Sequence, residues 1–270
     1  EEPRVAYDRV HLSEYFDPEK TAASLALADL NWYVLRSINL ILGNRVSAID
    51  KEKKEVTAQD GSIHAYDILV MATGSAPFVP PIPGADKEGV FVYRTIEDLD
   101  GMKAHAPHVE RGAVIGGGLL GLEAAKAMLD LGISDTQVIE FAPRLMPRQI
   151  DDRGSAVLQA KLETLGLKIR TSTNTSEIAG DGCIEAMKFA DGTEIPVDML
   201  VISAGIKPRD ELARDAGLEV GPRGGIVVDT LLTTSGPDIY AIGECALPNE
   251  MTYGLVAPGY EMADVVATNL

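Results

Sequence analysis

Residues 112–121 read GAVIGGGLLG, the most informative segment of this chain. Its apolar start predicts a strand, and its spaced glycines predict a tight turn into a helix over residues 122–131. A second apolar run at residues 137–139 predicts another strand, which ends on Glu140. Strand, glycine turn, helix, strand and terminal acid, in this order, form a dinucleotide-binding pattern.

The spaced glycines have distinct roles in this pattern. Gly116 permits the tight turn, Gly118 lets the backbone approach a pyrophosphate, and Gly121 lets the helix pack close to the strand. The N-terminus of the helix offers free N–H groups and partial positive charge to the phosphates. An ordinary strand–helix turn is the alternative for the glycines taken alone, but Glu140, 19 residues after Gly121, favours a nucleotide site.

The acid at the end of the second strand indicates which nucleotide is bound. A carboxylate there accepts hydrogen bonds from both ribose hydroxyls and repels a 2′-phosphate. Glu140 therefore predicts NADH in preference to NADPH. Arg144 and Arg148 lie just beyond and could soften this preference, although a solvated loop is the slightly favoured explanation for them.

The chain contains an internal repeat with an offset of 131 residues. The stretch 60–77 aligns without a gap on 191–208, and seven of eighteen positions are identical. Each copy has an Asp-Gly hairpin turn, a short polar strand, and an apolar strand (68–71 and 199–202) ahead of Gly-x-x-Pro. Such short apolar runs are typical of strands covered on both faces of a parallel sheet.

The repeat also predicts where its first copy begins. The glycine turn of the second copy starts at Gly116, so the corresponding turn of the first copy falls before residue 1. We therefore expect the first nucleotide-binding unit to lack its N-terminal strand, glycine loop and helix.

Three features outside the second copy suit a bulkier nucleotide ligand. Residues 72–74 (ATG) end an apolar strand, and their small side chains allow close backbone approach. Glu244 follows the predicted strand 239–242, where a carboxylate can hold a polyol chain, although an ordinary strand-end acid explains it equally well when it is taken alone. Pro258 predicts the first turn of a C-terminal helix, whose N-terminus favours negative charge, such as that on a reduced flavin.

Composition and charge disfavour several other classes of protein. The chain has 24 Lys+Arg against 41 Asp+Glu, a net charge of −17, and so acidic a chain repels nucleic acid. Cys183 and Cys245 form no C-x-x-C pair, and Cys245 is expected to be a packing residue. His105 and His108 lack further ligands, so no metal site is expected. The absence of a long apolar run and of a signal peptide predicts no membrane partner and a cytoplasmic location.

The glycine turn, residues 72–74 and residues 233–244 (TTSGPDIYAIGE) resemble the two-dinucleotide-fold flavoprotein reductases, over nearly all of the chain. The resemblance implies an α/β fold with two Rossmann-like domains that bind FAD and NAD(P)H, the first lacking its N-terminal β-α unit. It implies a partial FAD-binding domain at residues 1–108 and 236–270, and an inserted NAD(P)H-binding domain at residues 109–235.

The same resemblance implies the site residues. Residues 7–13 (YDRVHLS) look like a segment shared by ferredoxin, rubredoxin and nitrite reductases, in which the arginine lies beside the FAD diphosphate. No catalytic side chain is expected, because the flavin carries the chemistry, and Glu123 would orient the nicotinamide. The residues implied to bind FAD are Arg9, Val46, Ala72, Thr73, Gly74, Gly243 and Glu244. Those implied to bind NAD(P)H are Gly116, Gly118, Leu119, Leu120, Gly121, Glu123, Glu140 and Gly205.

A finer match is to the group of NAD(P)H-dependent nitrite reductase large subunits. Residues 7–13, 140–147 (EFAPRLMP) and 243–246 (GECA) look like this group. Two departures from the ferredoxin reductase pattern agree with it. Glu14 replaces their lysine after Leu-Ser, which argues against flavin tuning by that side chain, and Glu244 replaces their aspartate.

This resemblance implies a flavin-dependent oxidoreductase module that passes hydride from NADH to FAD and electrons onward. Downstream iron–sulfur and sirohaem modules, which are not in this sequence, would reduce nitrite to ammonium. The partners would be NAD(P)H and these modules, or a small electron-acceptor protein. A rubredoxin or ferredoxin–NAD(P)H reductase and a redox-inactive nucleotide-binding module remain alternatives. Because the first glycine loop is expected to be missing, this chain is expected to bind FAD poorly.

Overall fold

The computed structural model describes all 270 residues, which form two compact units. Both units are discontinuous in sequence. The predicted division by cofactor, with boundaries near residues 109 and 235, stays a prediction, because the units are defined by packing alone. Unit 1 comprises Glu1–Tyr7, Ala26–Ala76 and Ile206–Leu270, and unit 2 comprises Asp8–Leu25 and Pro77–Gly205.

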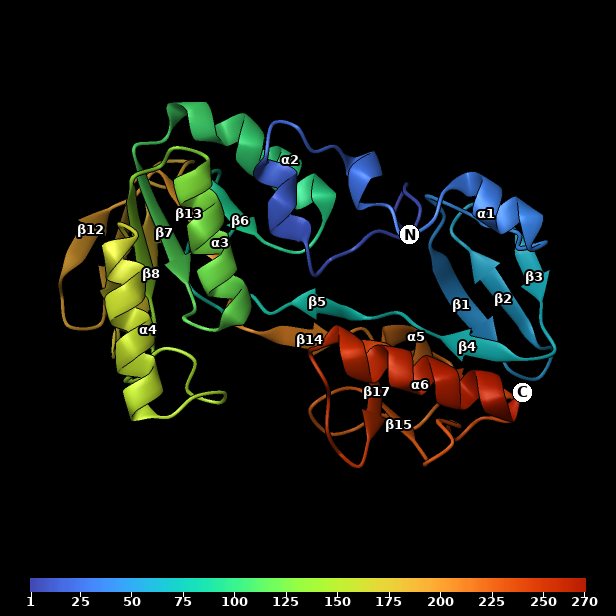
Figure 1. Ribbon diagram of the computed structural model, residues 1–270. Helices are drawn as coiled ribbons and strands as arrows, with labels where there is room; N and C mark the ends of the chain where they lie inside the picture. Colours follow the sequence, from blue (N-terminus) through green and yellow to red (C-terminus); the bar gives the residue numbers. More distant parts are fainter. The chain divides into compact units, whose positions relative to one another are not determined.

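Unit 2 is built on a five-stranded parallel sheet in the order β6-β13-β7-β8-β9 (Figure 1). All four residues of β13 are buried, as expected for a strand covered on both faces. The five strands are β6 (Val90–Val92), β7 (Arg111–Ile115), β8 (Asp135–Ile139), β9 (Lys168–Arg170) and β13 (Met199–Ile202).

Helices pack against this sheet and connect its strands. Helix α3 (Leu119–Asp130) joins β7 to its parallel neighbour β8 and packs against both, while α4 (Asp152–Thr164) packs against β9 (Figure 1). Helix α2 (Ile96–His105) packs against β6 and is followed by the 3-10 helix η3 (Ala106–His108). The 3-10 helix η1 (Leu12–Phe16) packs against both α2 and α3.

A second, antiparallel sheet completes unit 2. Its strands are β10 (Thr175–Ala179), β11 (Ala186–Phe189) and β12 (Glu194–Pro196), and the Asp-Gly turn at Asp191 joins the last two. Buried residues of both sheets form one core, which removes their apolar surface from water. This core includes Ala113, Ile139, Ile178, Met187, Leu200 and Ile202.

Unit 1 repeats part of this arrangement. Its antiparallel sheet β1-β2-β3 has the strand order of β10-β11-β12, and both sheets have a register shift in the first strand pair. Strand β4 (Leu69–Met71), the repeat counterpart of β13, pairs in parallel with β16 (Ile239–Ala241). The strands of the antiparallel sheet are β1 (Val46–Asp50), β2 (Glu55–Ala58) and β3 (Ile63–Ala65).

The repeat predicts that β4, like β13, is covered on both faces, but Val70 is 38% exposed. Strand β4 is an edge strand with one hydrogen-bonded neighbour, β16, whereas β13 lies between two strands and helix α3 packs against it. The remaining sheets are the pairs β14-β5 and β15-β17. The other elements of the chain are η2 (Ala22–Leu25), α1 (Leu30–Leu35), β5 (Ser75–Pro77), β14 (Ile206–Pro208), α5 (Glu211–Asp215), β15 (Ile226–Val228), η4 (Gly243–Cys245), β17 (Ala246–Pro248) and α6 (Val256–Asn269).

The α/β fold and the strands on either side of the glycine turn are confirmed. Helix α3 begins three residues earlier than predicted, at Leu119, because Gly118 is its N-cap and the apolar residues of the first turn are exposed. The C-terminal helix is confirmed, with Pro258 in its first turn. Cys245 is fully buried in the core of unit 1, as expected for a packing residue. No helix has the length and apolar character needed to cross a membrane.

Candidate functional site

The glycine turn after β7 is packed so tightly that two of its positions exclude any side chain. Gly116 has φ +117°, and a Cβ atom there would lie 2.2 Å from the carbonyl oxygen of Ser203. A Cβ atom at Gly121 would lie 1.9 Å from the carbonyl oxygen of Gly116. Gly118 differs, because nothing lies within 4 Å of its Cβ position. The turn therefore has packed glycines at both ends and open space at Gly118.

The first turn of α3 faces this open space with unused backbone donors. Gly118 is the N-cap in extended conformation, and no side chain caps the helix. Leu119 and Leu120 are 47% and 36% exposed. A helix of twelve residues with uncapped N–H groups and an open N-terminus attracts anions through its hydrogen-bond donors and its dipole.

Glu140 lies at the end of β8 and is bonded directly to the glycine turn. Its Oε2 accepts a hydrogen bond from the backbone N–H of Gly117 at 2.6 Å, and its Oε1 accepts one from Ala142 N–H at 2.6 Å. The carboxylate is thus fixed beside the turn, with lone pairs left for ribose hydroxyls. Arg144 forms an ion pair with Asp152 and donates to a backbone carbonyl, so its guanidinium is engaged within the loop.

Two further residues predicted to contact the nicotinamide also lie in unit 2. Glu123 is on the second turn of α3 and is half-buried. Burial raises the pKa of its carboxyl group above the usual value, and the charge of His11 opposes this rise. Gly205 follows β13 with φ +127° and open space around its Cβ position. All eight predicted NAD(P)H residues therefore belong to one unit.

In unit 1, the carboxyl ends of β4 and β16 bring two predicted FAD segments together. The strands are parallel neighbours, and Ile242 N–H donates to the carbonyl of Met71 at 3.0 Å. Ser75 Oγ donates to Glu244 Oε2 at 2.9 Å, which links the residue after 72–74 to the predicted ribityl carboxylate. Polar ligands bind at such strand ends in open α/β sheets.

The loop after β4 is further fixed by residues that sequence reasoning did not identify. Thr73 Oγ1 donates to the carbonyl of Arg209 at 2.6 Å, and Arg209 N–H donates to the carbonyl of Gly74 at 2.9 Å. The guanidinium of Arg209 pairs with Glu1 at 2.8 Å. These contacts are long-range in sequence, so no local pattern predicts them.

The first turn of α6 lies next to Gly243. A Cβ atom at Gly259 would lie 3.8 Å from the Gly243 Cα atom, and Gly243 N–H contacts the sulfur of Met262 at 3.2 Å. The helix has no side-chain cap. The uncapped first turn of α6 therefore lies beside Gly243, at the end of β16.

Two predicted FAD residues are not among these strand-end residues. Val46 begins β1, at the register shift with β2. Arg9 belongs to unit 2, where its Nη1 donates to the carbonyl of Arg94 at 2.7 Å. Unit 1 therefore holds six of the seven predicted FAD residues, without Arg9.

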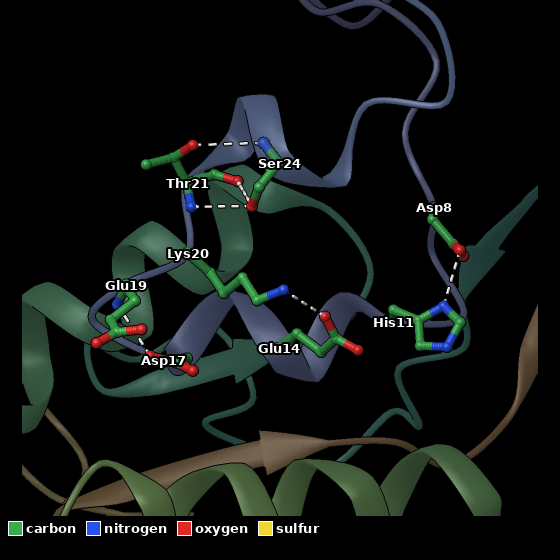
Figure 2. Close-up of polar contacts among 8 residues, drawn as sticks. All are labelled: Asp8, His11, Glu14, Asp17, Glu19, Lys20, Thr21 and Ser24. Atoms are coloured by element: carbon green, nitrogen blue, oxygen red, sulfur yellow. Dashed lines mark hydrogen bonds and ion pairs between the residues drawn. The ribbon is translucent and has the colours of Figure 1, made fainter.

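A pair that sequence reasoning missed lies on the segment before η1. His11 Nδ1 and Asp8 Oδ2 are 2.8 Å apart, and this hydrogen bond raises the pKa of His11 and lowers that of Asp8 (Figure 2). The spacing of three residues was visible in the sequence, but it indicates nothing without a known backbone conformation. Because η1 packs against α3, the pair belongs to the same unit as the glycine turn.

Unit 2 has the complete order of strand, glycine turn, helix and strand. Unit 1 has parallel strands whose carboxyl ends carry polar residues. Together the two units define a protein with two dinucleotide-binding folds. A family model described as pyridine nucleotide-disulphide oxidoreductase matches residues 1–264, and the chain belongs to this family.

Comparisons with individual proteins show how similar this chain is to particular oxidoreductases. The chain is 52% identical to the nitrite reductase (NADH) large subunit of Escherichia coli, over 100% of this chain and 32% of that protein. It is 34% identical to a rubredoxin-NAD(+) reductase of Pseudomonas putida, over 92% of this chain and 64% of that protein. The crystal structure of a ferredoxin reductase from Rhodopseudomonas palustris superimposes with a TM-score of 0.93 at 30% identity, covering 99% of this chain and 67% of that one. The chain thus spans about a third of the nitrite reductase subunit.

Proposed function

We propose that this chain is the electron-input segment of an NADH-dependent nitrite reductase large subunit. It takes hydride from NADH onto FAD and passes electrons to iron–sulfur and sirohaem modules that reduce nitrite to ammonium. The observation that carries the proposal is the geometry of unit 2, in which the packed glycine turn is hydrogen-bonded to Glu140. The 52% identity to the Escherichia coli subunit supports nitrite as the final acceptor.

The residues of unit 2 fit a dinucleotide. The open space at Gly118 suits a pyrophosphate, which would accept hydrogen bonds from the N–H groups of Leu119 and Leu120. Glu140 would accept hydrogen bonds from the adenosine ribose, and its fixed negative charge disfavours the 2′-phosphate of NADPH. Glu123 and Gly205 would line the nicotinamide end.

The residues of unit 1 fit a flavin nucleotide. Nothing lies within 4 Å of the Gly243 Cβ position, and Thr73 and Gly74 are held at the adjacent strand end. Glu244 would hold the ribityl chain, Val46 would meet the adenine through its backbone, and Arg9 would pair with the diphosphate. The N-terminus of α6 would favour the negative charge of the reduced ring.

When bound, FAD supplies the exchange between two-electron hydride chemistry and one-electron transfer. The protein's own contribution is positional. Glu123 orients the carboxamide of the nicotinamide, the glycine turn fixes the pyrophosphate, and Glu140 selects the nucleotide. No side chain acts as an acid or base in the hydride step. Residues 1–108 and 236–270 would form the FAD-binding part, and 109–235 the NADH-binding part.

A second candidate is a rubredoxin or ferredoxin reductase. The likeness to the rubredoxin-NAD(+) reductase of Pseudomonas putida, which covers most of both chains, favours it. The two candidates share the NADH–FAD step and differ in the electron acceptor. A cytoplasmic setting fits both.

The test is a comparison of acceptors with the purified full-length protein, downstream modules included, in its flavin-loaded form under anaerobic conditions. NADH should support conversion of nitrite to ammonium at a rate well above that of rubredoxin or ferredoxin reduction. Fast rubredoxin reduction without ammonium formation would favour the second candidate. Failure of NADH to reduce any acceptor would remove both and leave a redox-inactive nucleotide-binding module.

A further inference from the structure

The loop between β8 and α4 holds a cation on the same anchor as Glu140, the acid proposed to bind the ribose. Met146 N–H donates to the carbonyl oxygen of Gly117 at 2.9 Å, and Gly117 N–H donates to Glu140 Oε2 at 2.6 Å. Leu145 is fully buried, and a Cβ atom at Gly117 would lie 2.6 Å from its Cδ2 atom. Arg144 precedes Leu145 in this loop. The backbone of Gly117 therefore fixes both the carboxylate and the segment that carries the arginine.

The guanidinium of Arg144 is occupied by its own loop and by the start of α4. Arg144 Nη1 donates to Asp152 Oδ1 at 2.5 Å, and Arg144 Nη2 donates to the carbonyl oxygen of Pro147 at 3.1 Å. The Nε atom of Arg144 is buried and has no acceptor, so the two Nη groups alone hold the side chain. Asp152 supplies the charged partner, and it therefore neutralises Arg144.

The contact with Asp152 contributes little to the fold. Asp152 is the first residue of α4, and its side chain is 85% exposed. The helix is capped by the preceding residue, since Asp151 Oδ1 accepts a hydrogen bond from Gly154 N–H at 2.8 Å. Because an ion pair with so exposed a partner adds little to stability, the main consequence of the contact is that it occupies the guanidinium.

We propose that Asp152 is a specificity-determining residue: it occupies Arg144, which would otherwise bind the 2′-phosphate of NADP(H), and so enforces the preference for NADH. The inference deepens the proposed function and rests on it, because it requires the adenosine ribose to lie at Glu140.

The chemistry of the two nucleotides gives the reason. A guanidinium binds a phosphate through paired, charge-assisted hydrogen bonds, and a guanidinium that already donates to a carboxylate has fewer donors for it. The charge of Glu140 repels a 2′-phosphate, and the pair of Asp152 with Arg144 removes the cation that would offset this repulsion. NADH has no 2′-phosphate, so its binding does not depend on Asp152.

The test is calorimetric titration of NADP⁺ and of NAD⁺ into the oxidised, flavin-loaded full-length protein, downstream modules included. Asp152→Ala removes the carboxylate and leaves Arg144 free to bind a phosphate. The Kd of NADP⁺ should fall about tenfold, the effect of about one hydrogen bond between charged groups, while the Kd of NAD⁺ stays within about twofold. Asp152→Asn, which keeps an acceptor without the charge, should give a smaller gain in the same direction. An unchanged Kd of NADP⁺ in Asp152→Ala overturns the inference.

Two further variants show whether the gain comes through Arg144. The double variant Asp152→Ala/Arg144→Gln should lose the gain in NADP⁺ affinity. Asp130→Ala is the matched control, because it removes an exposed carboxylate from an ion pair with Lys126 at the C-terminal end of α3. It changes the net charge by the same amount and should leave the Kd of NADP⁺ unchanged. A gain that persists in the double variant, or that Asp130→Ala reproduces, overturns the inference, since net charge would then be its cause.

The wild-type protein distinguishes this inference from the proposed function. If the wild type binds NAD⁺ and Asp152→Ala leaves the Kd of NADP⁺ unchanged, the role of Asp152 alone is refuted. If the wild type binds neither nucleotide, the proposed function is contradicted as well. The Tm of Asp152→Ala should lie within roughly 3 °C of the wild type, so a change in NADP⁺ affinity does not reflect a change in folding.

Discussion

The packing of the glycine turn predicts that alanine has different effects on stability at Gly118 and at Gly121, which are three residues apart. A Cβ atom at Gly121 would lie 1.9 Å from the carbonyl oxygen of Gly116, whereas real Cβ atoms essentially never approach closer than 3.0 Å. Both atoms are in backbone that is fixed at the start of α3 and the end of β7, so neither can rotate away. Gly121→Ala therefore forces the helix from the strand, and overpacking of this kind costs about 3 kcal/mol.

The matched substitution is Gly118→Ala, where the new methyl group meets open space. Its φ of −85° is allowed for alanine, and the remaining cost is the loss of a preferred N-cap residue, under about 1 kcal/mol. The two variants should therefore separate stability from binding. Gly121→Ala loses stability, whereas Gly118→Ala keeps it and weakens NADH binding, because its methyl group occupies the space left for the pyrophosphate.

Thermal unfolding followed by circular dichroism gives the comparison. In a chain of this size, about 3 kcal/mol corresponds to a fall in Tm of roughly 6–12 °C for Gly121→Ala. Gly118→Ala should melt within roughly 4 °C of the wild type. Equal Tm losses in the two variants, or a Gly121→Ala variant that melts like the wild type, would refute the reasoning about the turn.

Three further predictions concern single carboxylates. Glu140→Gln should lower the preference for NADH over NADPH about tenfold in equilibrium titrations, since the repelling charge is lost; an unchanged ratio would contradict the role of Glu140. Asp198→Asn should destabilise the protein by about 1 kcal/mol at pH 7, a modest value because its partner Arg111 is partly exposed. Arg111 lowers the pKa of Asp198, so this stabilisation is present above the unfolded-state pKa of about 3.9 and is lost as the pH falls through the lower folded-state value. Asp67 is the exposed repeat counterpart of Asp198. Asp67→Asn should leave the free energy of unfolding unchanged in urea titrations, both at pH 7 and below the unfolded-state pKa. Glu244→Ala should reduce the flavin content of the purified full-length protein, measured after denaturation, and full retention would argue against a ribityl contact.

Local sequence predicted the parts of the site that depend on neighbouring residues. The glycine turn, the strands around it and the acid at the end of β8 form one short crossover, in which spacing fixes geometry. The internal repeat also predicted the strands β4 and β13, because both copies keep the same hairpin and strand. The exposed first turn of α3 was missed, since exposed leucines give no amphipathic signal.

The rest of the site depends on contacts between distant segments. Residues up to 169 positions apart are joined by these contacts. They are the hydrogen bond from Ser75 to Glu244, the hydrogen bonds of Arg209 to the loop after β4, and the packing of η1 against α3. No periodicity in one sequence specifies such pairs. Asp8–Leu25 packs with residues 77–205 and not with its sequence neighbours. This packing also depends on contacts between distant segments, so the local sequence did not predict it.

The most direct test of the central claim is anaerobic stopped-flow mixing of the flavin-loaded full-length protein, downstream modules included, with NADH. The account predicts rapid loss of the flavin absorbance near ~450 nm, the ordinary band of oxidised flavin, with NADH faster than NADPH at equal concentration. Reoxidation on adding nitrite should then restore the band. The account is contradicted if the full-length protein purifies without flavin, or if its flavin stays oxidised after NADH is added.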